Sequence, residues 1–266
     1  MDCEVLICPR NPKRARHILK QIGFAAKTKV VDVYTGVSEW VVMWGCGGKE
    51  QQIVYKQHRG KGGKVMFLDM GYFGRTLGTT RSAFRVSFNG NHPQDYIQLA
   101  GRHDRLRGIK IEDKYDPKGR IVLCGLGDKS RSFYGYEKLG WERSYLAKIR
   151  EIYPTREVVY RSKPRHSEVL AGCTNGNDGT IDDWLDGASL LVTHHSNCSV
   201  DAARLGIPAV CVDGIGFGFY GNDVARAEVK KKQERHEFLK KVAWFNWYPN
   251  ECEKLIQWVD GNNEQF

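Results

Sequence analysis

Residues 118–266 alternate short apolar runs with segments of helical periodicity, and this alternation constrains the fold more than any other feature of the sequence. The apolar runs are 120–125, 157–160, 189–193 and 208–212. They are rich in β-branched residues and lead into glycine, charged or histidine residues, which is typical of buried strands. Helical periodicity marks 137–153 and, over shorter spans, 182–187 and 199–205. Because strands joined by crossovers of this length form parallel sheets, this half is predicted to be a Rossmann-like α/β unit.

The rest of the chain is less regular but predicts a second α/β unit. Its expected strands are 4–8, 30–34, 39–44 and 64–68, with a helix over 12–22. The turn cluster 116–119 separates two predicted domains, 1–117 and 118–266. The segment 229–259 is predicted to form two helices separated near Pro249 and is assigned to the second domain. The expected fold class is therefore α/β, with two Rossmann-like halves and a cleft between them.

The net charge of +10 is concentrated in the first half of the chain. Residues 1–117 contain 20 lysines and arginines against 11 acidic residues, a net charge of +9, whereas 118–266 contain 21 against 20, a net charge of +1. The basic residues gather in 10–20, 56–64 and 102–110. One such cluster is ordinarily a solvated surface, but three in one half favour a polyanionic partner, most simply nucleic acid.

Several protein classes are excluded by composition. A hydrophobic content of 41% is too high for a disordered chain. The longest apolar runs, such as 40–44 and 188–192, are far shorter than the roughly 18–20 residues that span a bilayer, and no signal peptide opens with Met-Asp-Cys-Glu. The eight cysteines include no CxxC pair, so we expect reduced, mostly buried thiols. The sequence thus predicts a cytoplasmic protein that is not embedded in a membrane.

The ends of the predicted strands in the second half carry the small, polar and cationic residues that suit a nucleotide diphosphate. In open parallel sheets, ligands bind outside the carboxyl ends of the strands, where glycines admit main-chain amides and cations neutralise phosphate. The candidate donor-binding residues are Gly127, Lys129, Ser130, Arg161, Lys163, Arg165, His195, Ser196, Asn197, Ser199, Asp201 and Gly214. Each loop alone could be a simple turn, an exposed basic loop or a helix cap. Four consecutive ends of this kind favour a nucleotide pocket, and because adjacent histidines point different ways, no metal site is expected.

The run 191–208 (LVTHHSNCSVDAARLGIP), together with YRSKPRH at 160–166, resembles the donor side of two-domain glycosyltransferases of the GT-B architecture. The segments 67–93 and 244–258 resemble glycosyltransferase-like proteins carried by bacteriophages. The resemblance covers most of the chain from about Trp40 onward. It implies a GT-B-like fold and an enzyme that transfers a sugar from a nucleotide-diphosphate sugar, with a UDP-sugar as the expected co-substrate and no other cofactor.

The resemblance also implies roles for the donor-side residues. Lys129, Ser130, Arg161, Lys163 and Arg165 would face the donor diphosphate and stabilise the leaving group. Asp201 would accept hydrogen bonds from the ribose. No DxD motif stands at a strand end, so metal-dependent donor binding is not expected. The expected reaction proceeds with inversion.

The catalytic base is expected in the first half, and Asp69 is the candidate because it follows an apolar strand. A carboxylate there can take the proton of an attacking sugar hydroxyl, although it could equally cap the following turn. The candidate acceptor-binding residues are Arg75, Arg85, Asn89, Arg102 and Arg105, which could instead hold their own loops together.

The expected acceptor is DNA that carries hydroxymethylated pyrimidines. This expectation rests on the basic first half of the chain together with the resemblance to phage proteins. Such an enzyme would have to extract the base from the stack. The alternatives are transfer to a surface polysaccharide, epimerisation of a sugar nucleotide on the same fold, and a DNA-binding protein without catalysis. The sugar, the nucleotide, the base and the oligomeric state are left open by the sequence.

Overall fold

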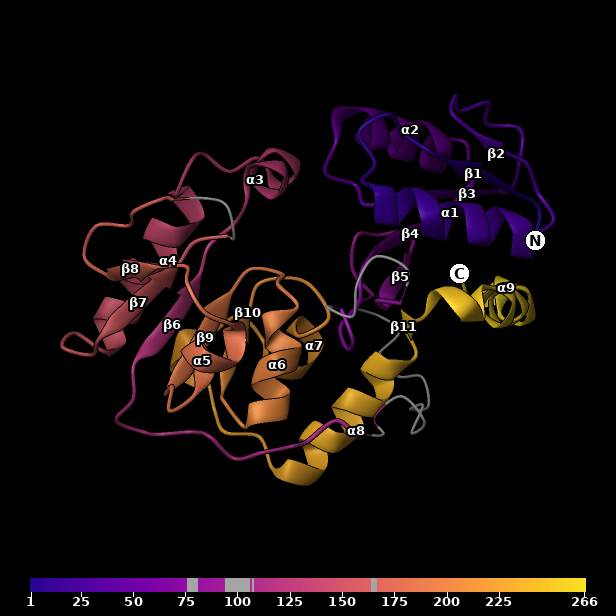
Figure 1. The fold of residues 1–266 in the computed structure, drawn as a ribbon. Coiled ribbons are helices and arrows are strands. Elements are labelled where there is room, and N and C mark those ends of the chain that lie inside the picture. The colour runs from indigo at the N-terminus through magenta and orange to yellow at the C-terminus, as the bar shows by residue number, and fades with distance from the viewer. Residues whose placement is uncertain (76–80, 94–105, 107, 164–166) are drawn as a thin grey trace. The chain divides into compact units, whose positions relative to one another are not determined.

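The computed structural model describes residues 1–266 apart from 76–80, 94–105, 107 and 164–166 (Figure 1). The chain forms two compact units. Unit 1 consists of Met1–Pro93 and Ala243–Phe266, and unit 2 of Gln94–Val242. This division differs from the boundary expected at residue 117. It also assigns the last segment of the chain, Ala243–Phe266, to unit 1 and not to the second domain. Each unit is described by itself below.

Unit 1 is built on a mixed sheet with the strand order β11-β5-β4-β3-β1-β2. Its strands are β1 (Cys3–Leu6), β2 (Val30–Val31), β3 (Trp40–Trp44), β4 (Lys64–Met70), β5 (Phe84–Phe88) and β11 (Asn246–Trp247). The first four run parallel, whereas β5 is antiparallel to both β4 and β11. The four strands predicted from the sequence are therefore confirmed, and β5 and β11 are additions at one edge.

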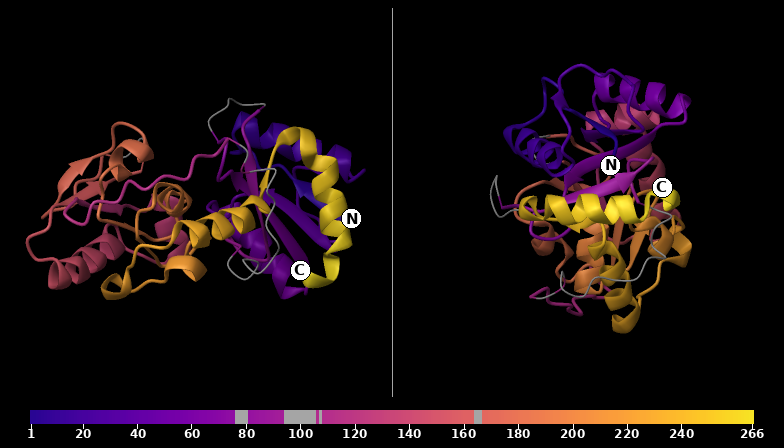
Figure 2. Two further views of the ribbon diagram at one scale, coloured as in Figure 1. Left: turned by 90° about the horizontal axis from the view of Figure 1, so that it is seen from below. Right: turned by 90° about the vertical axis from the view of Figure 1, so that its right-hand side faces the viewer.

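The helices of unit 1 cover both faces of its sheet. Helix α1 (Lys13–Ala25) connects β1 to β2, and α2 (Lys49–Gly60) connects β3 to β4. These two connections step in opposite directions along the sheet, so right-handed crossovers place the helices on opposite faces. Helix α9 (Cys252–Gly261) packs beside α1, as the yellow and indigo helices in Figure 2 show.

The C-terminal residues belong to unit 1 because they complete its core. Phe266 stacks on Phe88 with ring centroids 3.9 Å apart, and Trp258 packs against Phe88 at 5.7 Å. The indole nitrogen of buried Trp40 donates to Asn263 Oδ1 at 3.1 Å. The helices predicted within 229–259 are present as α8 (Lys232–Ala243) and α9, separated by β11 and a 3₁₀ turn, Pro249–Glu251. What the sequence could not predict is that the segment after α8, Ala243–Phe266, belongs to unit 1, whereas α8 itself packs on unit 2.

Unit 2 is built on an all-parallel sheet with the order β10-β9-β6-β7-β8. Its strands are β6 (Ile121–Cys124), β7 (Val158–Arg161), β8 (Thr174–Gly176), β9 (Leu190–Thr193) and β10 (Ala209–Cys211). Its helices are α3 (Asp128–Tyr134), α4 (Gly140–Ile152), α5 (Ile181–Leu185), α6 (Cys198–Leu205), α7 (Phe217–Tyr220) and, except for its last residue, α8, with a 3₁₀ turn at Val224–Arg226. Every strand and helix predicted for this half is confirmed, whereas α3, α7 and β8 were not predicted.

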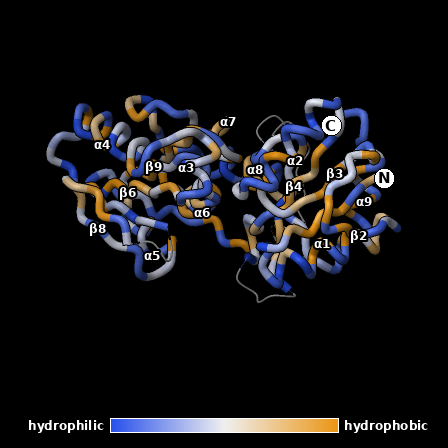
Figure 3. Tube along the Cα trace, turned by 90° about the horizontal axis from the view of Figure 1, so that it is seen from above, coloured by the Kyte–Doolittle hydropathy of each residue, from blue (hydrophilic) through white to orange (hydrophobic). Residues whose placement is uncertain are grey.

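The side chains of β6 alternate between two cores, one on each face of the sheet. Ile121 and Leu123 join the core formed with α4, whereas Val122 and Cys124 join the core formed with α5 and α6. Burial on both faces explains why these strands are continuous apolar runs in the sequence. In Figure 3, the trace is orange, the colour of hydrophobic residues, along β6 and β4. All eight cysteines are free thiols and all but Cys173 are buried, as expected. Within the described part of the chain, no helix has the length and apolar character needed to cross a bilayer.

Candidate functional site

The strand order of unit 2 creates a switch point between β6 and β9. From β6 the chain moves to β7 on one side, and from β9 it moves to β10 on the other. The loops that leave neighbouring strands therefore diverge to opposite faces, and open α/β sheets bind their ligands in the resulting crevice. The two loops are 125–127, which leads into α3, and 194–197, which leads into α6. The ends of β6 and β9, two of the four strand ends singled out from the sequence, are neighbours in this sheet.

The glycine turn after β6 is held from below by a buried carboxylate. Glu142 is fully buried, and its Oε1 accepts hydrogen bonds from the Leu126 amide at 2.8 Å and from Arg131 Nη2 at 2.7 Å. Gly125 has no room for a side chain, since a Cβ would collide with the Tyr160 hydroxyl. The path of the turn is therefore fixed by the core beneath it.

Arg131 extends this support to the loop after β7. Its Nη1 is 2.5 Å from Glu168 Oε1 and 3.2 Å from Asp128 Oδ1. Burial alone would lower the pKa of Arg131, but the hydrogen bonds and charges of Glu168 and Glu142 raise it above its ordinary value. The result is a charged, buried cluster that joins α3 and α4 to Glu168, in the segment after β7.

A chain of hydrogen bonds crosses the switch point. Ser130 Oγ lies 3.1 Å from His195 Nε2, His195 Nδ1 lies 3.0 Å from His194 Nδ1, and His194 Nε2 lies 3.3 Å from the Tyr136 hydroxyl. A hydrogen bond between two Nδ1 atoms contains one proton, so the two imidazoles are not both charged. Burial lowers the pKa of His194 to about 4, against a small opposing effect of Asp213. His194 is therefore neutral at physiological pH, and His195 is the histidine that is hydrogen-bonded to Ser130 of α3.

The loop after β10 packs against the same histidines. The Tyr134 hydroxyl donates a short hydrogen bond to Asp213, whose amide donates to the His194 carbonyl at 2.7 Å. Gly214 has a φ of +82°, and a Cβ there would lie 3.0 Å from the Cα of His195. Gly214 thus allows this loop to press against the main chain of His195, which is a packing role.

Two of the cations predicted for the donor, Lys163 and Lys129, lie near the glycine turn. The Lys163 stem passes close to Gly127. A hydrogen bond with Cys124 lowers the pKa of Cys198 at the start of α6 against the effect of burial, and Ser196 and the Lys163 charge add smaller effects in the same direction. Lys129 is exposed on the first turn of α3. Arg161 is the last residue of β7, and its guanidinium carbon lies 5.9 Å from the centre of the Trp184 ring. Arg165 is outside the described residues.

The predicted residues around α6 differ in exposure. Ser196 and Asn197 are half-buried at the end of the loop, and the Ser196 hydroxyl and carbonyl accept from the Cys198 amide at 3.5 Å and the Ser199 hydroxyl at 3.1 Å. Ser199 and Asp201 are buried, with 2% and 8% of their surfaces exposed. Ser196 and Asn197 are therefore open to a ligand, whereas Asp201 has little surface to offer a ribose.

In unit 1, Asp69 lies near the carboxyl end of β4 and is paired with Arg85. Its Oδ2 is 3.1 Å from Arg85 Nη2, and its Oδ1 accepts from the Met70 amide at 2.8 Å. Arg85 is almost fully buried, while Asp69 keeps 38% of its side chain exposed. Asp69 thus neutralises a buried guanidinium and still presents a carboxylate at the surface. Arg85 itself is too deep to contact an acceptor.

The other predicted acceptor residues do not gather around Asp69. Asn89 is at the opposite end of β4, where its Oδ1 accepts from the Val65 amide at 2.9 Å. Arg75 donates to the Tyr72 carbonyl at 3.0 Å and so supports its own loop. Arg102 and Arg105 are outside the described residues. The alternative that such residues hold their loops together therefore fits Asn89 and Arg75.

Sequence reasoning missed the residues that build the network rather than line it. These are Arg131, Glu142, Glu168, Tyr134, Tyr136, His194 and Asp213. The helical periodicity of 137–153 places Glu142 on the apolar face of α4 and was the available signal for it, whereas no such signal existed for Arg131 on the short helix α3. Among the described residues, no group of three or more histidine, cysteine or acidic side chains is arranged to hold a metal ion.

No protein-family profile matches the sequence, and no curated protein matches it either. Solved structures do match. One is Thermosulfurimonas dismutans KpsC, β Kdo 2,7 transferase, with a TM-score of 0.58 and 15% identity over 96% of this chain and 99% of that one. Another is Thermosulfurimonas dismutans KpsC, β Kdo 2,4 transferase, with a TM-score of 0.55 and 15% identity over 93% and 92%. At this identity the likeness establishes the fold, which is GT-B-like with two Rossmann-like α/β halves, as predicted.

Proposed function

We propose that the protein is a glycosyltransferase that moves a sugar from a nucleotide-activated donor to an acceptor hydroxyl. The observation that carries the proposal is the switch point of unit 2, where a glycine turn, cations and hydroxyl-bearing residues meet at the carboxyl ends of adjacent parallel strands. Proteins of the same fold that are named as Kdo transferases support this choice of reaction.

The donor phosphates are assigned to the crevice between the loops that follow β6 and β9. Lys163 and Lys129 supply positive charge there, and Ser130 and His195 supply a hydrogen-bonded pair that a phosphate oxygen can join. These cations can stabilise the charge that develops on the leaving phosphate, so we propose that the donor binds without a metal ion. A UDP-sugar remains our proposed donor.

The proposed reaction is a direct displacement with inversion. The acceptor oxygen forms a bond to the anomeric carbon, the bond from that carbon to the phosphate oxygen breaks, and its electron pair leaves with the nucleotide. The acceptor proton passes to Asp69, whose oxygens each retain a lone pair beyond the contacts to Arg85 and Met70.

The proposed acceptor is a glycan, and an acidic one, because the net charge of residues 1–117 is +9. The names of the fold neighbours favour a sugar acceptor over a nucleobase. DNA with hydroxymethylated pyrimidines is the second candidate, and the same charge asymmetry supports it.

The proposal is tested by incubating the protein with a panel of nucleoside mono- and diphosphate sugars and three acceptors: an acidic oligosaccharide, its neutral counterpart and hydroxymethylated duplex DNA. Transfer of the sugar, followed by mass spectrometry, is the expected result. Calorimetry in the presence of a chelator should show nucleotide binding that Lys163→Ala weakens by about 1.5–3 kcal/mol. Lys138→Ala, an exposed lysine of the same unit, is the matched control. Nucleotide binding that is absent, or that Lys163→Ala leaves unchanged, would contradict the donor site.

A further inference from the structure

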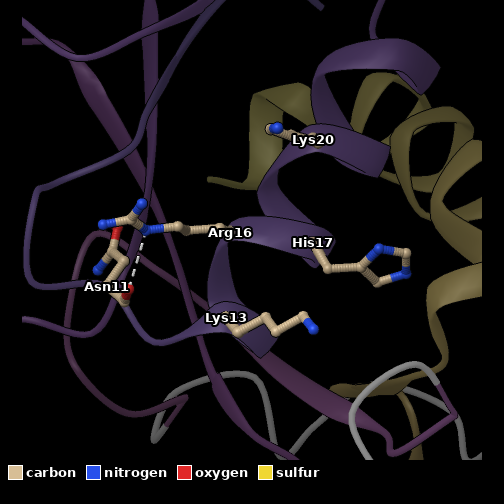
Figure 4. A pocket seen from close by; sticks show the side chains of 5 residues that line it. All are labelled: Asn11, Lys13, Arg16, His17 and Lys20. Atoms are coloured by element: carbon tan, nitrogen blue, oxygen red, sulfur yellow. Dashed lines mark hydrogen bonds between the residues drawn. The ribbon is translucent and has the colours of Figure 1, made fainter.

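The exposed side of α1 forms a basic hollow on the surface of unit 1. It is lined by Asn11, Lys13, Arg16, His17 and Lys20, shown in Figure 4. Four of these five residues carry basic side chains, and the glycosyltransfer chemistry described above uses none of them. The hollow therefore needs its own explanation.

The hollow begins at the ligand-binding edge of the first sheet. Unit 1 has its own switch point, because the chain moves from β1 to β2 on one side and from β3 to β4 on the other. Asn11 lies in the loop that leaves the carboxyl end of β1, and α1 starts at Lys13. Crevices of this kind receive ligands in α/β folds. The hollow is thus placed where a ligand of unit 1 is expected.

Three of its basic side chains form a stripe along one helix. Lys13, His17 and Lys20 are separated by four and three residues, so they share a face and extend over about 10 Å at 1.5 Å per residue. No ion pair that involves them is found within the described parts of the chain, and the first turn of α1 contains no acidic residue. The charge of this face is therefore not neutralised by its described surroundings.

The arginine of the hollow has a different role. Arg16 donates from Nε to the Asn11 carbonyl at 3.0 Å and from Nη2 to the Pro9 carbonyl at 2.5 Å. The Asn11 Oδ1 accepts from the Cys8 amide at 2.9 Å. Arg16 and Asn11 thus fix the loop that opens the hollow, and the lysines and the histidine remain as its binding groups.

We propose that this stripe binds an acidic glycan through its carboxylates and holds the acceptor chain at the edge of the first sheet. The proposal rests on the proposed glycosyltransferase function. Lysine and histidine act as separate point charges, which suits carboxylates spaced along a flexible chain, whereas the planar arginine fork that pairs best with phosphate is here bound to main-chain carbonyls. A concave stripe about 10 Å long also offers few contacts to a duplex, whose binding depends on many simultaneous phosphate contacts.

The test is a titration of the whole chain, without any donor, with a defined oligogalacturonate. The neutral oligosaccharide of equal length, a duplex DNA and phosphatidylglycerol vesicles are titrated in parallel. The test variant is Lys13→Glu/Lys20→Glu, which α1 tolerates because a glutamate at position 13 is favourable in the first turn and position 20 is exposed and suits glutamate as well as lysine. The matched control, Lys118→Glu/Lys138→Glu, makes the same change in net charge at exposed sites of unit 2.

We expect oligogalacturonate to bind in preference to the other three, and Lys13→Glu/Lys20→Glu to weaken it at least about tenfold, or roughly 1.4 kcal/mol. The control should retain the affinity of the native chain. Absence of oligogalacturonate binding, equal weakening in both variants, or tighter binding of DNA or vesicles that is lost in Lys13→Glu/Lys20→Glu would each overturn the proposal.

Activity separates this inference from the function on which it rests. Glycan binding that depends on Lys13 and Lys20, without transfer from any donor, would refute the transferase and leave the binding surface established. Transfer to an acidic glycan with the same KM in Lys13→Glu/Lys20→Glu as in the native chain would refute the surface and leave the transferase.

Discussion

Removing the buried carboxylate of Glu142 should destabilise unit 2 and disturb its nucleotide site together. Glu142→Ala eliminates two hydrogen bonds, those to the Leu126 amide and to Arg131, and leaves both donors in a site from which water is excluded. Breaking a buried ion pair from one side costs about 3–5 kcal/mol. Arg131 keeps Glu168 and Asp128 as partners, which places the expected loss near the lower limit, about 3 kcal/mol.

Denaturant unfolding measures this loss, and Glu151→Ala is the matched control because Glu151 is exposed on the same helix. We expect the control to change the free energy of unfolding by less than about 0.5 kcal/mol. Glu142→Gln should fall between the two, since an amide oxygen can still accept from Leu126 while the charge is lost. Equal stability of Glu142→Ala and Glu151→Ala would refute the claim that this cluster supports the glycine turn.

Three further predictions concern the histidine pair and the proposed base. Because burial lowers the pKa of His194 to about 4, only the unfolded chain protonates this imidazole as the pH falls from about 6.5 to 4. The free energy of unfolding should therefore fall by up to about 3 kcal/mol over this range, and His194→Gln should reduce its dependence on pH. The same pH dependence in the native chain and in His194→Gln would contradict this prediction. Gly214→Ala should weaken nucleotide binding and lower the free energy of unfolding by about 1–2 kcal/mol. The control Gly221→Ala has a similar φ of +74° but open space around it, so it should lower the stability without changing nucleotide binding. Equal nucleotide affinities of the two variants would contradict a role for the packing of Gly214 against His195. Asp69→Asn should lower the transfer rate about 10²–10⁴-fold at saturating substrates with donor affinity unchanged, and near-normal turnover of the folded variant would remove Asp69 as the base.

Most strands and helices of unit 2 could be predicted because each shows one clear local pattern, either a continuous apolar run or a helical period. Strands buried on both faces read as apolar runs, and β6 with its two cores is an example. Helix α3 escaped prediction because its seven residues are too few to show a period. Strand β8 escaped because Thr174–Gly176 contains no apolar residue and depends on its pairing with β7 and on side-chain hydrogen bonds of Asn175 with Leu170.

The parts that could not be predicted depend on contacts between distant segments. Strand β11 is two residues long and exists because Asn246 and Trp247 pair with β5. Asp69 was correctly placed near a strand end, but its ion pair with Arg85 depends on the antiparallel register of β4 and β5, which no local pattern encodes. For the same reason, Asn89 was grouped with Asp69 although it follows the far end of that hairpin.

The two switch points differ in how their polar groups are satisfied, and this difference favours different ligands. In unit 2, Ser130, His195 and His194 are joined by hydrogen bonds and supported by buried charges, so a ligand meets groups whose positions are already fixed. Such an arrangement reduces the ordering cost of binding and suits a ligand of constant structure, as the nucleotide part of a donor is. In unit 1, Lys13 and Lys20 are exposed on one helix and can move to meet charges at several spacings. That freedom lowers affinity for any single ligand but tolerates a chain of varying length and linkage, which is what an acceptor glycan presents.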